Sequence, residues 1–89
     1  MKVYHYKNTP IIQIVDVSDG WVILESEKNH PNNISNLYKI DQSHKEIWRG
    51  TALWGWLRCD NDILIVEDSY GEGKLNHHTG EIKDLKIIK

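Results

Sequence analysis

The sequence predicts an all-β domain built from antiparallel sheets. Short runs rich in β-branched and aromatic residues recur along the 89 residues, about ten residues apart, and clusters of Asn, Asp, Ser and Gly separate them. Such clusters favour tight turns because these residues accept positive φ or cap the turn with their side chains. The runs are residues 4–6, 11–17, 21–25, 37–40, 47–48, 63–66 and 82–88. A sandwich or a propeller-type sheet is the expected architecture.

Each half of the chain suggests hairpins in the same order. In the first half, a turn at residues 18–20 joins two apolar runs, and a polar turn at 41–45 joins two more. A short helix is the alternative for residues 43–57, because Ser43 and Glu46 have the spacing of a capping box. Gly50 and Gly55 disfavour that helix, and Trp, Ile and Thr prefer strands, so a strand is the main expectation here.

The chain also contains an internal repeat. Residues 37–47 align with residues 72–82, because both stretches read as a strand, a polar turn and a Glu-Ile pair that opens the next strand. Residues 19–25 likewise parallel residues 61–67, where a turn leads into an apolar run that ends in an acid. We therefore expect one domain, 1–89, with repeat units at about 1–49 and 50–89.

Within the first repeat, residues 37–41 (Leu-Tyr-Lys-Ile-Asp) lead through a short turn to residues 46–48 (Glu-Ile-Trp). This resembles the unit of quinoprotein-type (PQQ-like) β-propeller blades, in which a Leu-Tyr-x-Leu-Asp strand passes through a Thr-Gly turn to a strand ending in Trp. Residues 78–82 resemble the same turn, although residues 43–45 replace Thr-Gly in the first copy and Lys83 replaces the closing Trp in the second. The layout also resembles small uncharacterised bacterial proteins with two blade-like repeats.

That resemblance concerns structural positions, so it implies no cofactor and in particular no quinone. Propellers usually contain four to eight blades. Two units must therefore pair face to face with each other or with another chain.

Composition limits the classes of partner. With 11 basic and 13 acidic residues, the chain lacks the clustered positive charge that nucleic-acid binding requires. No run approaches the ~18 apolar residues that span a bilayer, so no membrane partner is expected. The single cysteine, Cys59, cannot form an internal disulfide, which favours a reducing compartment, the cytoplasm.

The tryptophans are the main candidates for a binding site. The chain has four Trp and no Phe. Trp54 and Trp56 would share one face if both lay in a strand. Buried, they would fill a small core; exposed, they would anchor a protein partner or stack on a sugar ring. Tyr70, which precedes a predicted corner at Gly71, completes the candidate set.

Two further patterns are weaker. His77 and His78 are adjacent, so on a strand they would point to opposite faces and could not bind one metal ion together. Only a turn at that point would change this, and we expect no metal site. Titratable residues show no convergent catalytic pattern either, so an enzyme is not expected.

The sequence therefore favours a non-enzymatic protein-interaction or binding module. Two repeats leave sheet edges unpaired, and such edges recruit another chain unless they are blocked. A homodimer or another protein partner follows as a prediction. The alternative is a small-ligand binding protein, for example one for carbohydrates, that uses exposed tryptophans.

Overall fold

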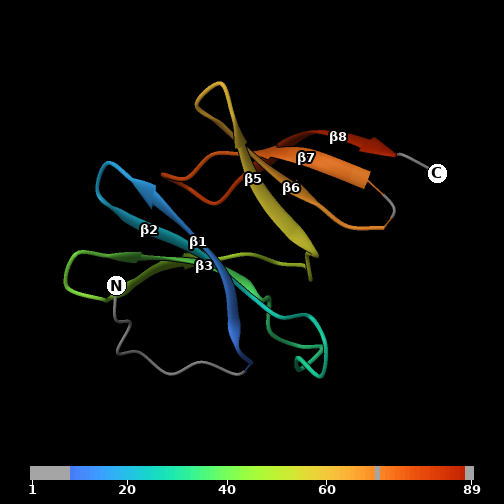
Figure 1. Ribbon diagram of the computed structural model, residues 1–89, viewed down its shortest axis with the longest axis horizontal. Helices are drawn as coiled ribbons and strands as arrows, with labels where there is room; N and C mark the ends of the chain where they lie inside the picture. The colour runs from blue at the N-terminus through green and yellow to red at the C-terminus, as the bar shows by residue number, and fades with distance from the viewer. Residues whose placement is uncertain (1–8, 70, 88–89) are drawn as a thin grey trace.

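The computed structural model describes residues 9–69 and 71–87 and shows two four-stranded antiparallel sheets, confirming the all-β fold class (Figure 1). The first sheet contains β1 (Ile11–Val17), β2 (Gly20–Glu25), β3 (Leu37–Asp41) and β4 (Glu46–Arg49), and the second contains β5 (Trp56–Asp60), β6 (Ile63–Glu67), β7 (Gly71–Leu75) and β8 (Ile82–Ile87). In both sheets the strands are neighbours in chain order. The arrangement is sandwich-like, and none of the described residues forms a helix long and apolar enough to cross a membrane.

Most of the predicted strands are present, and the helix alternative for residues 43–57 is wrong. That stretch forms turns, β4 and the beginning of β5. The composition-based runs missed β5 and β7, although the alignment of residues 72–82 with residues 37–47 did predict a strand at β7. β7 has the sequence Gly-Glu-Gly-Lys-Leu, and glycine is depleted in strands because it contributes no side chain to the pleated surface. The predicted run at residues 4–6 lies outside the described residues.

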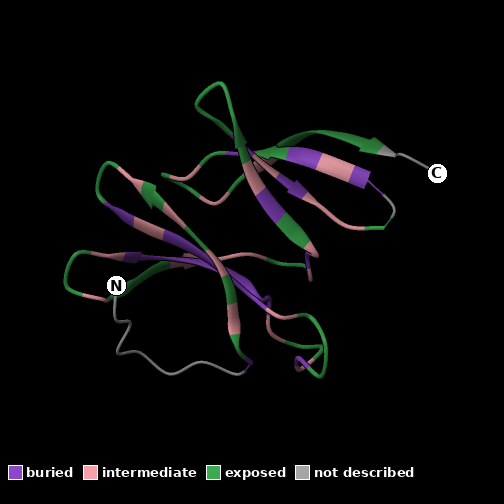
Figure 2. Ribbon diagram, viewed as in Figure 1, coloured by how far each residue is buried: buried purple, intermediate pink, exposed green. Residues whose placement is uncertain are grey.

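The two sheets share one apolar core between their facing sides (Figure 2). Every second residue of a strand points to the same face, which explains why alternate positions of β2 and β6 enter this core. The buried members are Val22, Leu24, Leu37, Trp54, Leu57, Leu64, Val66 and Leu75. Apolar side chains from both sheets are thereby removed from water together, which is the main force holding the sheets face to face.

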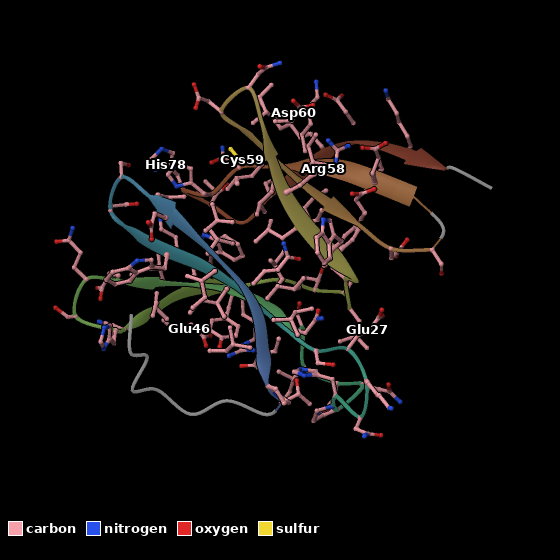
Figure 3. All side chains as sticks on the ribbon, viewed as in Figure 1. Glu27, Glu46, Arg58, Cys59, Asp60 and His78 are labelled. Atoms are coloured by element: carbon pink, nitrogen blue, oxygen red, sulfur yellow. The ribbon has the colours of Figure 1, made fainter. Side chains whose placement is uncertain are left out.

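The outer faces of the two sheets differ. On the first sheet, Ile23, Tyr38 and Ile40 form a second, fully buried apolar cluster. On the second sheet, Arg58 pairs with Glu67 at 3.0 Å and with Glu72 at 2.8 Å (Figure 3). A third sheet stacked on this second outer face would remove these paired charges from water, which is costly.

Side-chain contacts join the sheets at both edges. At one edge the Gln13 amide of β1 pairs with the backbone of Leu57 in β5: its oxygen accepts from the Leu57 N–H at 2.7 Å, and its nitrogen donates to the Leu57 carbonyl. At the other edge the Trp48 indole of β4 lies against Gly80 and donates to the His77 carbonyl at 2.8 Å. These contacts fix how one sheet sits on the other.

The β3–β4 and β7–β8 turns use the same local bonding. The Asp41 carboxylate accepts from the N–H of Ser43 at 2.8 Å, and the Asn76 amide oxygen accepts from the N–H of His78 at 2.9 Å. Each is a side chain bonded to the backbone two residues on, which stabilises a turn. The aligned positions of the two halves therefore have equivalent roles here.

Candidate functional site

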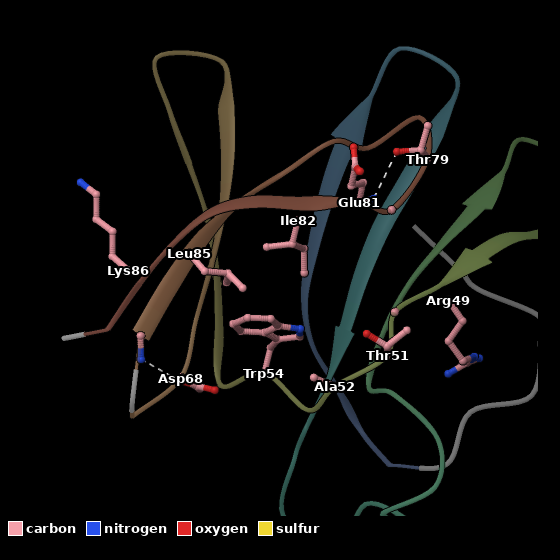
Figure 4. A pocket seen from close by; sticks show the side chains of 13 residues that line it. Arg49, Thr51, Ala52, Trp54, Asp68, Thr79, Glu81, Ile82, Leu85 and Lys86 are labelled. Atoms are coloured by element: carbon pink, nitrogen blue, oxygen red, sulfur yellow. Dashed lines mark hydrogen bonds between the residues drawn. The ribbon is translucent and has the colours of Figure 1, made fainter. Parts of the chain in front are cut away.

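A pocket of about 620 Å³ opens between the sheets, near β4 and β8 (Figure 4). One wall is the connection between the sheets, from Arg49 to Trp54, and the opposite wall is the β7–β8 turn with Ile82 and Leu85 of β8. Asp68, Gly71 and Lys86 complete the lining.

Small residues create this space. Gly50 and Ala52 line the connection wall, and Gly71 and Gly80 line the opposite side, so four positions contribute almost no side-chain volume. Gly73 has a related role, because a Cβ there would lie 2.5 Å from the Ile82 Cγ2. Without a side chain at Gly73, Ile82 can lie close to β7 instead of filling the space above it.

Trp54 forms an apolar wall of the pocket, and its backbone is tightly held. The Asn36 side chain is fully buried; it donates to the Trp54 carbonyl at 2.7 Å and accepts from the Trp54 N–H at 2.9 Å. The Trp54 side chain is nine-tenths buried, and its Nε1 has no hydrogen-bond partner among the described residues. Leaving such a donor unpaired costs about 1–3 kcal/mol.

The charged groups of Arg49 and Glu81, two residues of the pocket lining, make their contacts with residues outside the pocket. The Arg49 guanidinium donates to the Ser35 carbonyl at 2.8 Å and to Glu46 at 2.6 Å, and it lies 4.3 Å from the centre of the Tyr38 ring. Glu81 is exposed and lies 3.6 Å from Lys83. The Asp68 carboxylate accepts from the Gly71 N–H at 2.9 Å, and Figure 4 shows the Lys86 ammonium directed away from Trp54 and Ile82. The walls around Trp54 are therefore formed by neutral groups.

Trp54 and Trp56 do not share a face, so that prediction is wrong. Trp54 is buried between the sheets, whereas Trp56 is 54% exposed on the outer face of the second sheet. β5 begins only at Trp56, because Asn36 has already bonded the two backbone groups of Trp54 that a neighbouring strand would use. Tyr70, the third candidate, lies outside the described residues.

Sequence reasoning missed the rest of the pocket. Neither the connection at residues 50–52 nor the apolar pair Ile82 and Leu85 was singled out. The available signal was the spacing of Gly71 and Gly73. Two glycines two residues apart lie on the same face of a strand, so that face has no side chain at either position.

A second cluster joins the tips of two hairpins. Asp19 of the β1–β2 turn lies with His77 and His78 of the β7–β8 turn, and one ligand atom from each falls within 4.8 Å of the others. Figure 3 shows His78 beside the β1–β2 turn. The adjacent imidazoles lie on one side, with ring centres 4.0 Å apart, because the chain turns here instead of continuing as a strand.

Lys39 already supplies the positive charge of this cluster. Its Nζ, on a side chain that is 1% exposed, lies 2.7 Å from the Asp19 carboxylate and 3.3 Å from Nδ1 of His77. Burial lowers the pKa of His77, and the charges of His78 and Lys39 lower it further. The Lys39 ammonium repels a divalent cation at the same place. The cluster is therefore a set of polar and ionic contacts that links the two sheets.

A group of buried polar side chains also lies on the outer face of the first sheet. The fully buried Glu25 carboxylate accepts from the Tyr38 hydroxyl at 2.6 Å and from the Thr9 N–H at 3.2 Å. Burial, followed by the bond and the charge of Glu25, raises the pKa of Tyr38. His30 lies 3.7 Å from the same carboxylate, so these residues hold the 26–36 loop against the sheet.

No protein-family model matches this chain, and no curated protein or solved structure matches it either. The functional argument therefore rests on the pocket and on the groups that line it.

Proposed function

We propose that this protein is a non-enzymatic binding module that holds a small molecule in the pocket between its sheets. The observation that carries this proposal is the Trp54 indole: a nine-tenths-buried side chain on the pocket wall whose N–H has no partner among the described residues. Ligand sites are typically concave, about 300–1,000 Å³ in volume, and mostly apolar with a few placed polar groups. The pocket fits this description.

We also propose that the two sheets are blade-like units of the quinoprotein type. Trp48 is the penultimate residue of β4 in the first unit and packs on Gly80, which belongs to the Thr-Gly turn of the second. The resemblance drawn from the sequence assigned a strand-ending Trp and a Thr-Gly turn to these two positions. Their direct contact supports the proposal.

Blocking the pocket tests the binding function. Ala52 lines the pocket with an exposed side chain, so Ala52→Trp fills it from the rim without entering the core. Ser43→Trp, in the exposed β3–β4 turn, adds the same side chain away from the pocket. A fragment library is screened by saturation-transfer NMR against the wild type and both variants.

The proposal expects fragments that bind the wild type and Ser43→Trp but lose most of their signal with Ala52→Trp. A screen in which all three proteins give the same bound fragments, or in which none binds, rules out a ligand site in this pocket.

A second candidate is self-association through an edge strand. β1 is an edge strand, and Ile12 and Ile14 on it are 47% and 39% exposed. Exposed apolar edges favour pairing with another chain, and a charge placed on them prevents it. Sedimentation equilibrium should show a dimer that Ile14→Lys converts to a monomer. A wild-type monomer at every concentration up to the millimolar range would exclude this candidate.

A further inference from the structure

We infer that the ligand of this pocket is a neutral, mainly apolar molecule whose carbonyl-type oxygen accepts a hydrogen bond from Nε1 of Trp54. This inference rests on the proposed binding function and adds the chemical class of the ligand.

The apolar part of the inference follows from the walls. The Trp54 ring, Ile82 and Leu85 line the pocket next to one another (Figure 4). An aromatic ring offers a flat surface for stacking, and the aliphatic side chains gain contact area without a preferred direction. A flat apolar ligand body therefore fits against this surface.

The neutral part follows from the charges. Arg49 is bonded to Ser35 and Glu46, and it is turned away from the pocket interior. The Asp68 carboxylate accepts from the Gly71 N–H at 2.9 Å. Lys86 also lines the pocket, but Figure 4 shows its ammonium directed away from Trp54 and Ile82. An anionic ligand group would therefore leave water without gaining an opposite charge beside Trp54, and that loss is large.

The acceptor follows from Trp54 itself. Figure 4 shows its ring nitrogen on the side of the ring that faces Thr51 and Ile82. The nitrogen is shielded from solvent, so a ligand oxygen reaches it only when a wall side chain moves. A carbonyl oxygen suits this site because it accepts a hydrogen bond and carries no proton that would need an acceptor in turn.

Three matched probes test the inference: acetophenone, α-methylstyrene, which replaces the carbonyl by a C=CH₂ group of the same shape, and benzoate, which replaces the methyl ketone by a carboxylate. Binding is followed on ¹⁵N-labelled protein. The Trp54 indole signal is assigned as the one missing from the spectrum of Trp54→Phe, and the other three indole signals serve as internal controls.

The expected result is that acetophenone binds about tenfold more tightly than α-methylstyrene and shifts the Trp54 Nε1–H signal downfield, with benzoate the weakest of the three. In Trp54→Phe the two neutral probes should bind equally. If Trp54→Phe does not fold, the wild-type ranking and the single shifted indole signal still decide the matter.

Other outcomes separate the two proposals. Equal binding of both neutral probes without a shift of the Trp54 signal overturns the acceptor but leaves the binding pocket standing. Tightest binding by benzoate overturns the neutral ligand. Absence of binding by every probe, together with a failed fragment screen, overturns the proposed function itself.

Discussion

At the scale of single residues, neighbours decide what each tryptophan does. Trp48 packs on a glycine across the sheet interface, Trp54 is held between the sheets by Asn36, and Trp56 remains exposed. The sequence identified Trp54 and Trp56 as candidates, but their spacing gave the wrong relative orientation. The bond to Asn36, 18 residues away, decides it, and local periodicity cannot reveal such a contact.

Gly80 should be among the least replaceable residues. It has a φ of +82°, and a Cβ there would lie 2.7 Å from Cδ2 of Trp48. Gly80→Ala combines left-handed strain with overpacking, so we expect it to lower the free energy of unfolding by about 3 kcal/mol in urea titrations.

Adding Trp48→Leu to Gly80→Ala should recover part of that loss, because the smaller side chain makes room for the new methyl group. A Gly80→Ala protein as stable as the wild type would mean that Trp48 does not pack on this turn.

His77 should make stability depend on pH. Its pKa in the folded protein is lowered from 6.5, mainly by burial, so the unfolded chain binds a proton more readily than the folded chain does. Stability is then greatest above pH 6.5 and falls as the pH drops through 6.5 towards the folded-state pKa. The lowered pKa of Asp19 acts in a separate window, below pH 3.8.

Urea unfolding at pH 7.5 and pH 5.0 measures this effect. We expect His77→Gln to show a smaller loss of stability between the two pH values than the wild type, and His44→Asn, in the other turn, to behave like the wild type. An unchanged loss in His77→Gln would assign the pH dependence to other groups.

At the scale of elements, alternation and turn residues were sufficient to predict most strands. Three predicted runs either alternate apolar and polar residues or are continuously apolar, and turns rich in Gly or Asp bound them. These are the runs at 11–17, 21–25 and 63–66. β5 and β7 escaped the composition-based reading for physical reasons: β7 contains two glycines, and β5 is a short mixture of apolar and charged residues. Both are strands because β6 lies between them and pairs with each.

Asn36 should be the most important polar link between the elements. It bonds the Glu25 carbonyl at 2.8 Å and both backbone groups of Trp54 while fully buried. Removing it breaks three buried hydrogen bonds, so Asn36→Ala should cost at least about 3 kcal/mol. Hydrogen exchange should also accelerate at the Trp54 N–H.

Asn36→Asp provides the matched comparison, because its carboxylate can still accept from the Trp54 N–H but cannot donate to the two carbonyls. We expect protection of the Trp54 N–H to survive in that variant better than in Asn36→Ala. Equal protection in all three proteins would show that Asn36 does not fix Trp54.

At the scale of the whole molecule, the proposed binding function depends on how two similar sheets meet. They are joined along β1 and β5 by Gln13 and at the far edge by Trp48, and the small residues near β8 leave the space between these contacts incompletely filled. From the sequence we predicted two units that pair face to face with each other or with another chain. The sequence could not predict the pocket, because its walls come from segments up to 37 residues apart whose distance depends on the packing of the complete sheets.

The central claim is that this space is a ligand site lined by Trp54, Ile82 and Leu85. The most direct measurement is a set of intermolecular nuclear Overhauser effects between acetophenone and ¹³C-labelled methyl groups of the full chain. The account predicts cross-peaks to the methyl groups of Ile82 and Leu85 and none to those of Ile12 or Ile14 on the outer face of the first sheet. Cross-peaks confined to the outer face would contradict it.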